Sequence, residues 1–434
     1  MKRFLVLVEL LVVSVLAFNS LAFGAKTELT LWMFSLTPET QKWMQEELVP
    51  QFEKKFPDYT VRIQYVPYEG YREKIGTALS AKTLPDIFEE GTQSAGWMAS
   101  SGTVIPVDKW VKNWAEVKDF YPAAWKQPQY QGRQWGIPFY MHPSTLLYWK
   151  DVFKEVGLDP NKPPYTQEAY LEYAKKLQKV EENRTVRLGA WAPDGWRALF
   201  QEFEVVIQRF GGKLVSDDYT KVLFDGEEGV KALSYLVKLH QTVYSPGVAK
   251  LPEQTPIPWF AQKAIAMHFR AYTTEVKNVL RYNPEAFKDL GFGIPLRAEG
   301  YTRKVSIQWR NSLFISVNCK NPDVAIEFIK LFVSPKNNVK YCDLQGYVPV
   351  RKSALSLKSV QESPYMGKFM TLAGPYGHDV VSPPSYFELR QKAGIFFEEA
   401  SLGKRTVKSA IEEAAKVWRE QLPKEPKPVI PPGY

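Results

Sequence analysis

Residues 136–151 read GIPFYMHPSTLLYWKD, an apolar run with prolines at 138 and 143 that leads directly into a second apolar run. A short helical stretch follows, and then a proline-rich passage that ends at Thr166, a residue type that caps helices. This order is typical of a chain that leaves one compact lobe and begins another. We therefore predict that residues 138–143 cross between two lobes and that a cleft lies beside the crossing.

The first 25 residues have the pattern of an export signal. Lys2 and Arg3 give a positive start, and residues 4–23 are apolar except for two serines, one asparagine and Glu9. Small residues around position 24 suit signal peptidase. A retained membrane anchor is the alternative, and Glu9 would make it costly in a bilayer. We predict that residues 1–25 are a signal peptide and that the protein is exported to the periplasm or the cell surface.

Length, charge and cysteine content narrow the class of protein. About 410 residues remain after the signal, more than one core usually supports, so two lobes are expected. The formal charge is +9 and the two signs are interspersed, a pattern that argues against nucleic-acid binding. Cys319 and Cys342 are too few for a disulfide framework. Export would permit a bond between them, and two free thiols fit the sequence about as well.

Apolar strands and amphipathic helices alternate along the chain. Residues 29–34 read as a strand, Thr37 as the cap of a helix, and residues 61–65 and 86–88 as further strands. This alternation predicts βαβ units and a mainly parallel sheet. The predicted fold class is α/β, with two lobes joined by short crossover strands.

Three later segments complete the predicted organisation. Residues 303–317 alternate and then become apolar, which predicts a second crossover, and residues 347–351 predict a third. Thr406 is expected to cap an amphipathic helix near the end of the chain. The tail at 423–432 contains five prolines and is expected to be extended.

The sequence carries no recognisable catalytic, metal or cofactor motif. It has no P-loop, dinucleotide fingerprint, nucleophile elbow or zinc helix. Its four histidines are scattered, and His240 falls on an apolar helix face, where a core role is expected. Adjacent acidic pairs such as Glu89-Glu90 do not by themselves provide two carboxylates facing each other across a glycosidic bond. We therefore predict no catalytic residue, no metal ligand and no cofactor.

Aromatic residues are abundant and favour a carbohydrate ligand. The chain has 13 Trp, 23 Tyr and 25 Phe. Most belong to the core, but several stand at expected strand ends or loops beside polar groups, including Phe34, Tyr140 and Phe387. The C–H face of a sugar stacks on an aromatic ring, while its hydroxyls need planar hydrogen-bonding partners.

Several segments, taken in order, resemble one family. They are LPDI at 84–87, WGIP at 135–138, YWKDVF at 148–153, FAQKAIAM at 260–267, GYVP at 346–349 and LGKRTVKSA at 402–410. Together they resemble the extracellular solute-binding proteins of ABC transporters, in the sugar-binding family that includes maltose-binding protein. The resemblance covers nearly all of the chain after residue 25.

The resemblance implies a periplasmic-binding-protein fold of two α/β lobes around a ligand cleft, with crossover strands acting as a hinge. It assigns residues 26–141 and 304–350 to an N-terminal lobe, and residues 142–303 and 351–434 to a C-terminal lobe. It also implies a monomer that delivers a sugar, oligosaccharide or polyol to the membrane permease of an ABC transporter. The ligand-binding positions that it implies are Phe34, Ser35, Glu89, Glu90, Thr92, Tyr140, His142, Trp196, Arg270, Tyr272, Trp309, Arg310, Asn311, Tyr386 and Phe387.

Some of these positions depart from the family pattern. Maltose-binding protein has an acid where His142 stands and a tryptophan where we align Tyr272, so the resemblance supports the cleft and not maltose itself. Arg270 and Arg310 would suit a carboxylate or phosphate on the ligand. We favour the other interpretation, in which each arginine pairs with Glu89 or Glu90 and orients it for sugar hydroxyls. A secreted carbohydrate-active enzyme is the alternative function, and a structural protein of the envelope is a weaker third.

Overall fold

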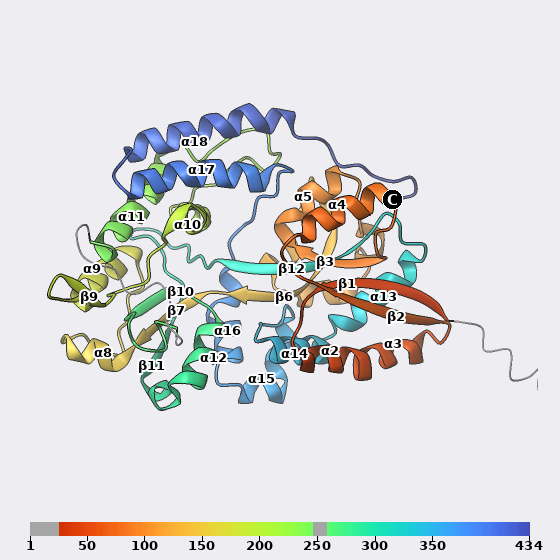
Figure 1. The fold of residues 1–434 in the computed structure, drawn as a ribbon, viewed down its shortest axis with the longest axis horizontal. Coiled ribbons are helices and arrows are strands. Elements are labelled where there is room, and N and C mark those ends of the chain that lie inside the picture. The colour runs from red at the N-terminus through yellow and green to blue at the C-terminus, as the bar shows by residue number, and fades with distance from the viewer. Residues whose placement is uncertain (1–25, 246–257) are drawn as a thin grey trace, which may run out of the picture.

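The computed structural model describes residues 26–245 and 258–434 (Figure 1). The predicted signal peptide lies outside the described residues, as does the side chain of Trp309. No helix in the described ranges has the length and apolar character needed to cross a membrane.

The first lobe is built on a five-stranded sheet. Its strand order is β2-β1-β3-β12-β6, and β1 pairs in parallel with both β2 and β3. Strand β12 is antiparallel to both of its neighbours, so only half of the strand pairs are parallel. The predicted mainly parallel sheet is thus correct only for the first βαβ units. The strands are β1 (Thr27–Phe34), β2 (Tyr59–Val66), β3 (Ile87–Gly91), β6 (Gly136–Pro143) and β12 (Gln308–Ile315).

Helices cover both faces of this sheet. Their apolar sides pack on the buried strand residues, as in other α/β layers. A small hairpin of β4 (Gln129–Tyr130) and β5 (Arg133–Gln134) lies beside it. The helices of this part are α2 (Pro38–Trp43), α3 (Val49–Lys55), α4 (Tyr71–Ala81), α5 (Ala95–Ser100), α6 (Asp108–Val111), α7 (Pro122–Lys126), α13 (Pro322–Phe332) and α14 (Pro335–Gln345).

The second lobe has a smaller sheet and a larger helical layer. Its strands are ordered β10-β7-β11 and both pairs are antiparallel, so the expectation of a parallel sheet is wrong here. The strands are β7 (Thr145–Trp149), β10 (Met267–Ala271) and β11 (Leu290–Gly293), with a surface hairpin of β8 (Lys179–Glu181) and β9 (Arg184–Arg187). The helices are α8 (Lys150–Glu155), α9 (Gln167–Leu177), α10 (Gly195–Arg209), α11 (Glu227–Val243), α12 (Thr273–Tyr282), α17 (Tyr386–Ser401) and α18 (Val407–Gln421).

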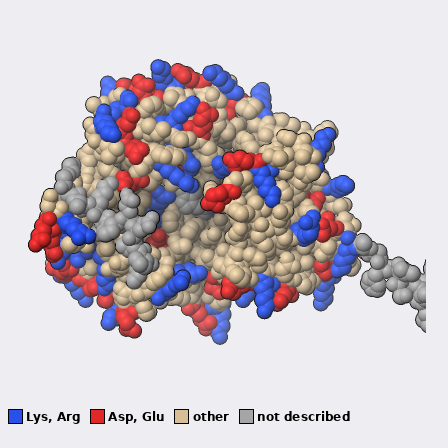
Figure 2. Space-filling view, in the orientation of Figure 1, with Lys and Arg blue, Asp and Glu red and all other residues tan. Residues whose placement is uncertain are grey.

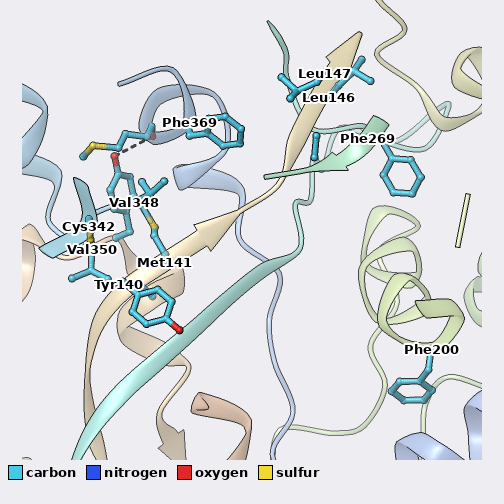
Figure 3. Close-up of a cluster of buried hydrophobic side chains, with 14 of the residues drawn as sticks. Tyr140, Met141, Leu146, Leu147, Phe200, Phe269, Cys342, Val348, Val350 and Phe369 are labelled. Carbon is cyan, nitrogen blue, oxygen red and sulfur yellow. Dashed lines mark hydrogen bonds between the residues drawn. The ribbon is translucent and has the colours of Figure 1, made fainter. Parts of the chain in front are cut away.

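Strands β6 and β12 join the two lobes, as the sequence predicts. They pair antiparallel from Gly136 to Pro143, and β7 of the second sheet begins two residues later. Figure 3 shows Tyr140 and Met141 on this crossing packed near Val348, while Leu146 and Leu147 lie beyond it in the second lobe. Residues 347–351, the predicted third crossing, lie against this strand, since Val348 forms an isolated bridge to Met141. Helices α15 (Lys358–Glu362) and α16 (Met366–Leu372) lie beneath these connections.

The predicted helix caps are confirmed. The side chains of Thr37, Thr166 and Thr406 accept hydrogen bonds from backbone N–H groups three residues later, at 3.3, 3.1 and 3.2 Å respectively. Each satisfies one of the free donors at a helix start. His240 is buried, as predicted, with Nε2 3.1 Å from Asp194 Oδ1.

The two cysteines are free thiols. Cys342 is buried and Cys319 half-buried. Burial raises the pKa of the Cys319 thiol to about 12, so the thiolate needed for disulfide chemistry is disfavoured. Of the two alternatives that the sequence allowed, the structure has the unpaired one.

The C-terminal tail crosses back to the first lobe. Val429 N donates a hydrogen bond to Ala99 O (2.8 Å), and Ser100 Oγ donates one to Pro426 O (2.9 Å). The ring of Tyr434 packs 5.9 Å from that of Trp110. Pro423 lies in a short 3-10 helix (Leu422–Lys424), so the predicted extended tail is found only beyond it, where the prolines remove backbone donors and the chain reaches a distant surface. Its contacts place the last residues against the first lobe, whereas the sequence analysis assigned all of 351–434 to the second.

Candidate functional site

A cavity of about 370 Å³ lies between the two lobes. Figure 2 shows the surface hollowed between the lobes, with Lys or Arg side chains at the edge of the hollow. The lining comes from both lobes and from the crossing strand β12. The lining residues are Phe34, Tyr68, Arg72, Glu90, Gly91, Gln93, Arg197, Gln201, Arg270, Arg310, Asn311, Phe387 and Arg390.

The first wall of the cavity is formed where strands end. Phe34 is the last residue of β1, and Asn311 lies on β12 opposite the end of β3. Behind them, the carboxylate of Glu89 accepts hydrogen bonds from Asn311 Nδ2 (2.7 Å) and from Phe34 N (3.0 Å). Burial raises the pKa of Glu89 to about 7, against the lowering effect of these two bonds. Glu89 therefore fixes two lining residues from behind.

Glu90 faces the cavity, and groups of its own lobe hold its carboxylate. Its Oε1 accepts hydrogen bonds from Ser94 Oγ (2.9 Å) and Gly91 N (3.0 Å) and lies 3.4 Å from Arg72 Nη2. The guanidinium of Arg72 also lies 3.4 Å from the ring centroid of Phe387, which belongs to the second lobe. Stacking of a cation on an aromatic ring is favourable at this distance. This contact links the two walls.

The second wall is formed by two helices and the end of a strand. Arg197 and Gln201 are one turn apart on α10, while Phe387 and Arg390 share a face of α17. Arg270, on β10, donates to Gln201 Oε1 (2.7 Å), and its Nη1 lies 3.3 Å from Glu202 Oε1. Glu202 is fully buried behind this wall.

Six of the predicted ligand-binding positions line the cavity, namely Phe34, Glu90, Arg270, Arg310, Asn311 and Phe387. Eight lie outside the lining, namely Ser35, Glu89, Thr92, Tyr140, His142, Trp196, Tyr272 and Tyr386. The backbone of Trp309 pairs with His142 between β12 and β6.

Interior contacts explain why most of these residues do not face the cavity. Tyr140 stacks on Tyr347 at 4.0 Å between centroids, and Figure 3 shows it among buried side chains. Thr92 Oγ1 donates to Gln127 Oε1 (2.8 Å). The hydroxyl of Tyr386 donates to the carboxylate of Glu204 at 2.8–2.9 Å. Each of these polar groups has its hydrogen-bonding needs met inside the protein.

The remaining positions lie beside the cavity. Ser35 is exposed just after β1, and its backbone N donates to Val66 O (3.1 Å). Trp196 packs 6.0 Å from the guanidinium of Arg390. His142 packs on Tyr272 with 4.5 Å between centroids, and burial lowers the pKa of His142 to about 4. His142 is thus neutral near pH 7 and half-buried behind the lining, although it was predicted as a ligand-binding position.

The favoured pairing of the arginines with Glu89 and Glu90 is wrong. Arg72, which the sequence analysis did not select, pairs with Glu90, and Arg270 pairs with Glu202. Helical spacing could have pointed to some of the lining residues that the sequence prediction missed. Arg390 lies three residues after Phe387, and Gln201 four after Arg197. The further missed residues are Tyr68 and Arg72, near the start of α4, Gly91, at the end of β3, and Gln93, just after β3.

Comparison with known proteins assigns the chain to a family. Residues 47–368 match the profile of the family described as bacterial extracellular solute-binding protein, a match that covers well over half of the chain. The chain belongs to the bacterial extracellular solute-binding protein family. Members of this family are exported binding proteins, not enzymes.

Two relatives and one solved structure are named for different ligands. The solute-binding protein is 25% identical over 338 residues to the diacetylchitobiose binding protein DasA of Streptomyces coelicolor, covering 76% of this chain and 74% of DasA. It is 30% identical over 175 residues, 38% of each chain, to the sn-glycerol-3-phosphate-binding periplasmic protein UgpB of Brucella abortus. The sugar-binding protein MalE of Xanthomonas citri superposes with a TM-score of 0.78 at 22% identity, covering 92% of this chain and 98% of MalE. That superposition confirms the predicted two-lobed fold.

Proposed function

We propose that this solute-binding protein binds a carbohydrate or polyol between its lobes and delivers it to the membrane permease of an ABC transporter. The observation that carries the proposal is the composition of the interlobe cavity. Phe34, Tyr68 and Phe387 contribute aromatic rings, with one face of Phe387 covered by the guanidinium of Arg72, and Asn311 and Gln201 contribute planar amides. This combination suits a ring with one apolar face and several hydroxyls.

The ligands named for the relatives support a carbohydrate or polyol. DasA is named for a disaccharide derivative, MalE for a sugar and UgpB for a phosphorylated polyol. A cavity of about 370 Å³ between walls that belong to different lobes would bury one to a few sugar rings.

Binding is proposed to draw the lobes together about the crossing strands β6 and β12, with the closed form recognised by the permease. The hinge separates 26–141 with 304–350 from 142–303 with 351–424, and the tail from 425 onward accompanies the first lobe. We further propose that the protein acts as a monomer in the periplasm or at the cell surface.

A carbohydrate-active enzyme is the alternative that the sequence left open. Glycoside hydrolysis needs two carboxyl groups facing each other across the bond to be cleaved. The described lining contains one carboxylate, Glu90, and that group is held by Arg72, Ser94 and the backbone of Gly91. The lining therefore favours binding without chemistry.

Titration calorimetry against monosaccharides, disaccharides, polyols and acidic sugars tests this function. We expect saturable binding of at least one compound, recovery of that compound intact, and a smaller radius of gyration by X-ray scattering when it is bound. A silent panel would refute carbohydrate binding. Cleaved product would favour the enzyme, and an unchanged radius of gyration at saturation would refute closure.

A further inference from the structure

The cavity is lined by far more positive than negative charge. Five arginines contribute to the lining, and the single described carboxylate there is Glu90. The lining arginines are Arg72, Arg197, Arg270, Arg310 and Arg390. A neutral sugar needs hydrogen-bond acceptors and donors in similar measure, whereas an arginine supplies only donors and a positive charge.

Two of the five arginines are occupied by groups of the protein. Arg72 is engaged by Glu90, Ser94 and the ring of Phe387. Arg270 donates to Gln201 Oε1 (2.7 Å) and Tyr272 Oη (3.0 Å) and is paired with Glu202. These two cations are balanced before any ligand arrives.

Arg310 is different, since it is buried without a balancing charge. Its side chain is about 1% exposed, and Nη2 donates to Gln308 Oε1. Its Nε and Nη1 have no hydrogen-bond partner among the described residues. Burial lowers the pKa of Arg310 to about 9. Asp379 opposes that lowering, but its carboxylate accepts its hydrogen bond from Arg303 (2.7 Å).

Neutral surroundings complete the setting of Arg310. Burial lowers the pKa of the nearby His378 to about 3, so this imidazole is uncharged near pH 7. A Cβ added at Gly377 would stand 2.2 Å from Arg310 Nη2, so the backbone closes one side of the guanidinium. A buried cation with two free donors is costly unless an anion joins it. Arg310 belongs to the lining of the cavity, so an anion would approach it from there, although Nε and Nη1 are covered in this structure.

The facing wall offers two more cations. Arg390 is 8% exposed, with its Nε unpartnered among described residues and its guanidinium 5.1 Å from the ring centroid of Phe387. Arg197 stands exposed at the edge of α10. No salt bridge joins either residue to a carboxylate within 26–245 and 258–434, although the charge of Arg390 acts on the buried carboxylate of Glu204 and opposes the rise of its pKa. An anion between Arg310 on β12 and the helices α10 and α17, which carry Arg197 and Arg390, would contact both lobes.

We propose that the ligand of this cavity carries an oxyanion, a carboxylate or a phosphate on a sugar or polyol, and that Arg310 receives it. The proposal rests on the proposed function and specifies its ligand class. The unpartnered Nε and Nη1 lie on different edges of the Arg310 guanidinium, so either can donate a charge-assisted hydrogen bond to an oxyanion oxygen. Arg390 and Arg197 add positive charge from the second lobe, so the ligand's charge helps to hold the lobes closed.

Matched pairs of compounds test the proposal by calorimetry on the whole mature chain. They are galacturonate with galactose, glucose 6-phosphate with glucose, and glycerol 3-phosphate with glycerol. We expect at least one anion to bind at least about 30-fold tighter than its neutral partner at low salt. The pair that shows the preference distinguishes carboxylate from phosphate. Neutral partners that bind as tightly as the anions would overturn the proposal and leave the proposed function standing. Silence from all six would overturn the proposal if a neutral disaccharide of the wider panel binds, and silence from the whole panel would refute both.

Variants locate the anion at Arg310. Arg310→Gln should reduce the preference for the anion to within about 3-fold, and Arg310→Lys should restore part of it by keeping the charge. Arg62→Gln is the matched control, since Arg62 pairs with Glu28 on the outer surface and its side chain is 61% exposed. An undiminished preference in Arg310→Gln would overturn the role of Arg310.

Two measurements on the unmodified protein keep the test independent of the variants. Raising KCl from 20 to 500 mM should weaken anion binding by about 3-fold or more and leave neutral binding unchanged, because salt screens charge. Equal salt dependence would contradict the proposal. Inorganic phosphate and acetate alone should bind at least about 100-fold more weakly than the best sugar anion, as they lack the ring and hydroxyls. Equal affinity would overturn the sugar part of the ligand.

Discussion

The two walls of the cavity use arginine in opposite ways. On the second-lobe wall, Arg270 has the buried carboxylate of Glu202 behind it at 3.3 Å. On the crossing strand β12, Arg310 is more deeply buried than Arg270, with two unpartnered donors and no carboxylate partner among the described residues. The charge of Arg270 is thus balanced within the protein, whereas no carboxylate of the described residues pairs with Arg310.

This difference separates structural from ligand-binding cations. A buried ion pair is strongly destabilised when one partner is removed, because the other is left uncompensated. A buried cation that waits for a ligand behaves in the reverse way, since its removal relieves the free protein and harms the complex. The same chemical change at Arg270 and Arg310 should therefore give opposite results.

The largest expected effect is at Arg270. Arg270→Met should lower the free energy of unfolding by about 2–3 kcal/mol at pH 7, because Glu202 loses its ion-pair partner. This loss is smaller than is usual when one partner of a buried ion pair is removed, because Arg209 also lowers the pKa of Glu202 and still balances part of its charge. Urea unfolding followed by circular dichroism measures it. Unchanged stability would remove the structural half of the comparison.

Glu89 gives the next effect, which depends on pH. Burial raises its folded pKa to about 7 from an ordinary value of 4.5, so the folded state holds a proton that the unfolded state has released. Its contribution to stability is present below about pH 4.5 and is lost as pH rises toward 7. Glu89→Gln does not titrate, and should therefore gain about 1–3 kcal/mol relative to the wild type between pH 4.5 and pH 8.

Denaturation of both proteins at several pH values measures this gain, because other titrating groups cancel in the difference. Glu28→Gln is a suitable control on the outer surface, where Glu28 pairs with the exposed Arg62. A difference between wild type and Glu89→Gln that stays flat with pH would show that Glu89 titrates as an ordinary acid.

Tyr386 and Phe387 are adjacent on α17, and they contrast an interior side chain with one that lines the cavity. Tyr386→Phe removes the hydroxyl that donates to Glu204, and should cost about 1–2 kcal/mol of stability with ligand affinity unchanged. Phe387→Ala should weaken ligand binding by about 1–2 kcal/mol instead, through lost stacking and burial. Thermal denaturation measures the stability of both variants, and calorimetry measures their ligand affinity. An affinity loss confined to Tyr386→Phe would mean that Tyr386, and not Phe387, faces the ligand.

The smallest effect, and the opposite in sign to that at Arg270, is expected in the free protein at Arg310. Arg310→Met should leave stability unchanged or raise it by up to about 1 kcal/mol, because a buried unbalanced charge is replaced by an apolar chain of similar length. Urea unfolding without ligand is the measurement. A loss comparable to that of Arg270→Met would show that the protein itself balances Arg310.

Local sequence rules predicted the frame of the molecule. Proline spacing and apolar runs located the crossing at 136–143, and Thr37, Thr166 and Thr406 marked helix starts, because these features depend on neighbours in the chain. The sheet direction in the second lobe was missed, since strand and helix order alone does not exclude antiparallel pairing.

The sequence led to part of the cavity lining, and the ligand-binding role of these residues stays a prediction. Six lining residues were selected from strand ends, a crossing strand and a helix start, yet Tyr140 and Tyr386 turn inward to partners far away in sequence, Tyr347 and Glu204. Partner choice among Arg72, Arg270 and the acids depends on three-dimensional packing that no spacing rule records. Helical spacing from Phe387 would have led to Arg390.

A structure of the complex with the tightest-binding anion would show directly whether Arg310 receives the charged group. We expect a carboxylate or phosphate oxygen about 2.7–3.2 Å from Nε or Nη1 of Arg310, with the lobes closed and Arg390 or Arg197 on the same group. This expectation would be contradicted by a ligand whose charged group points to solvent or to Arg72 while Nε and Nη1 of Arg310 remain without a ligand oxygen.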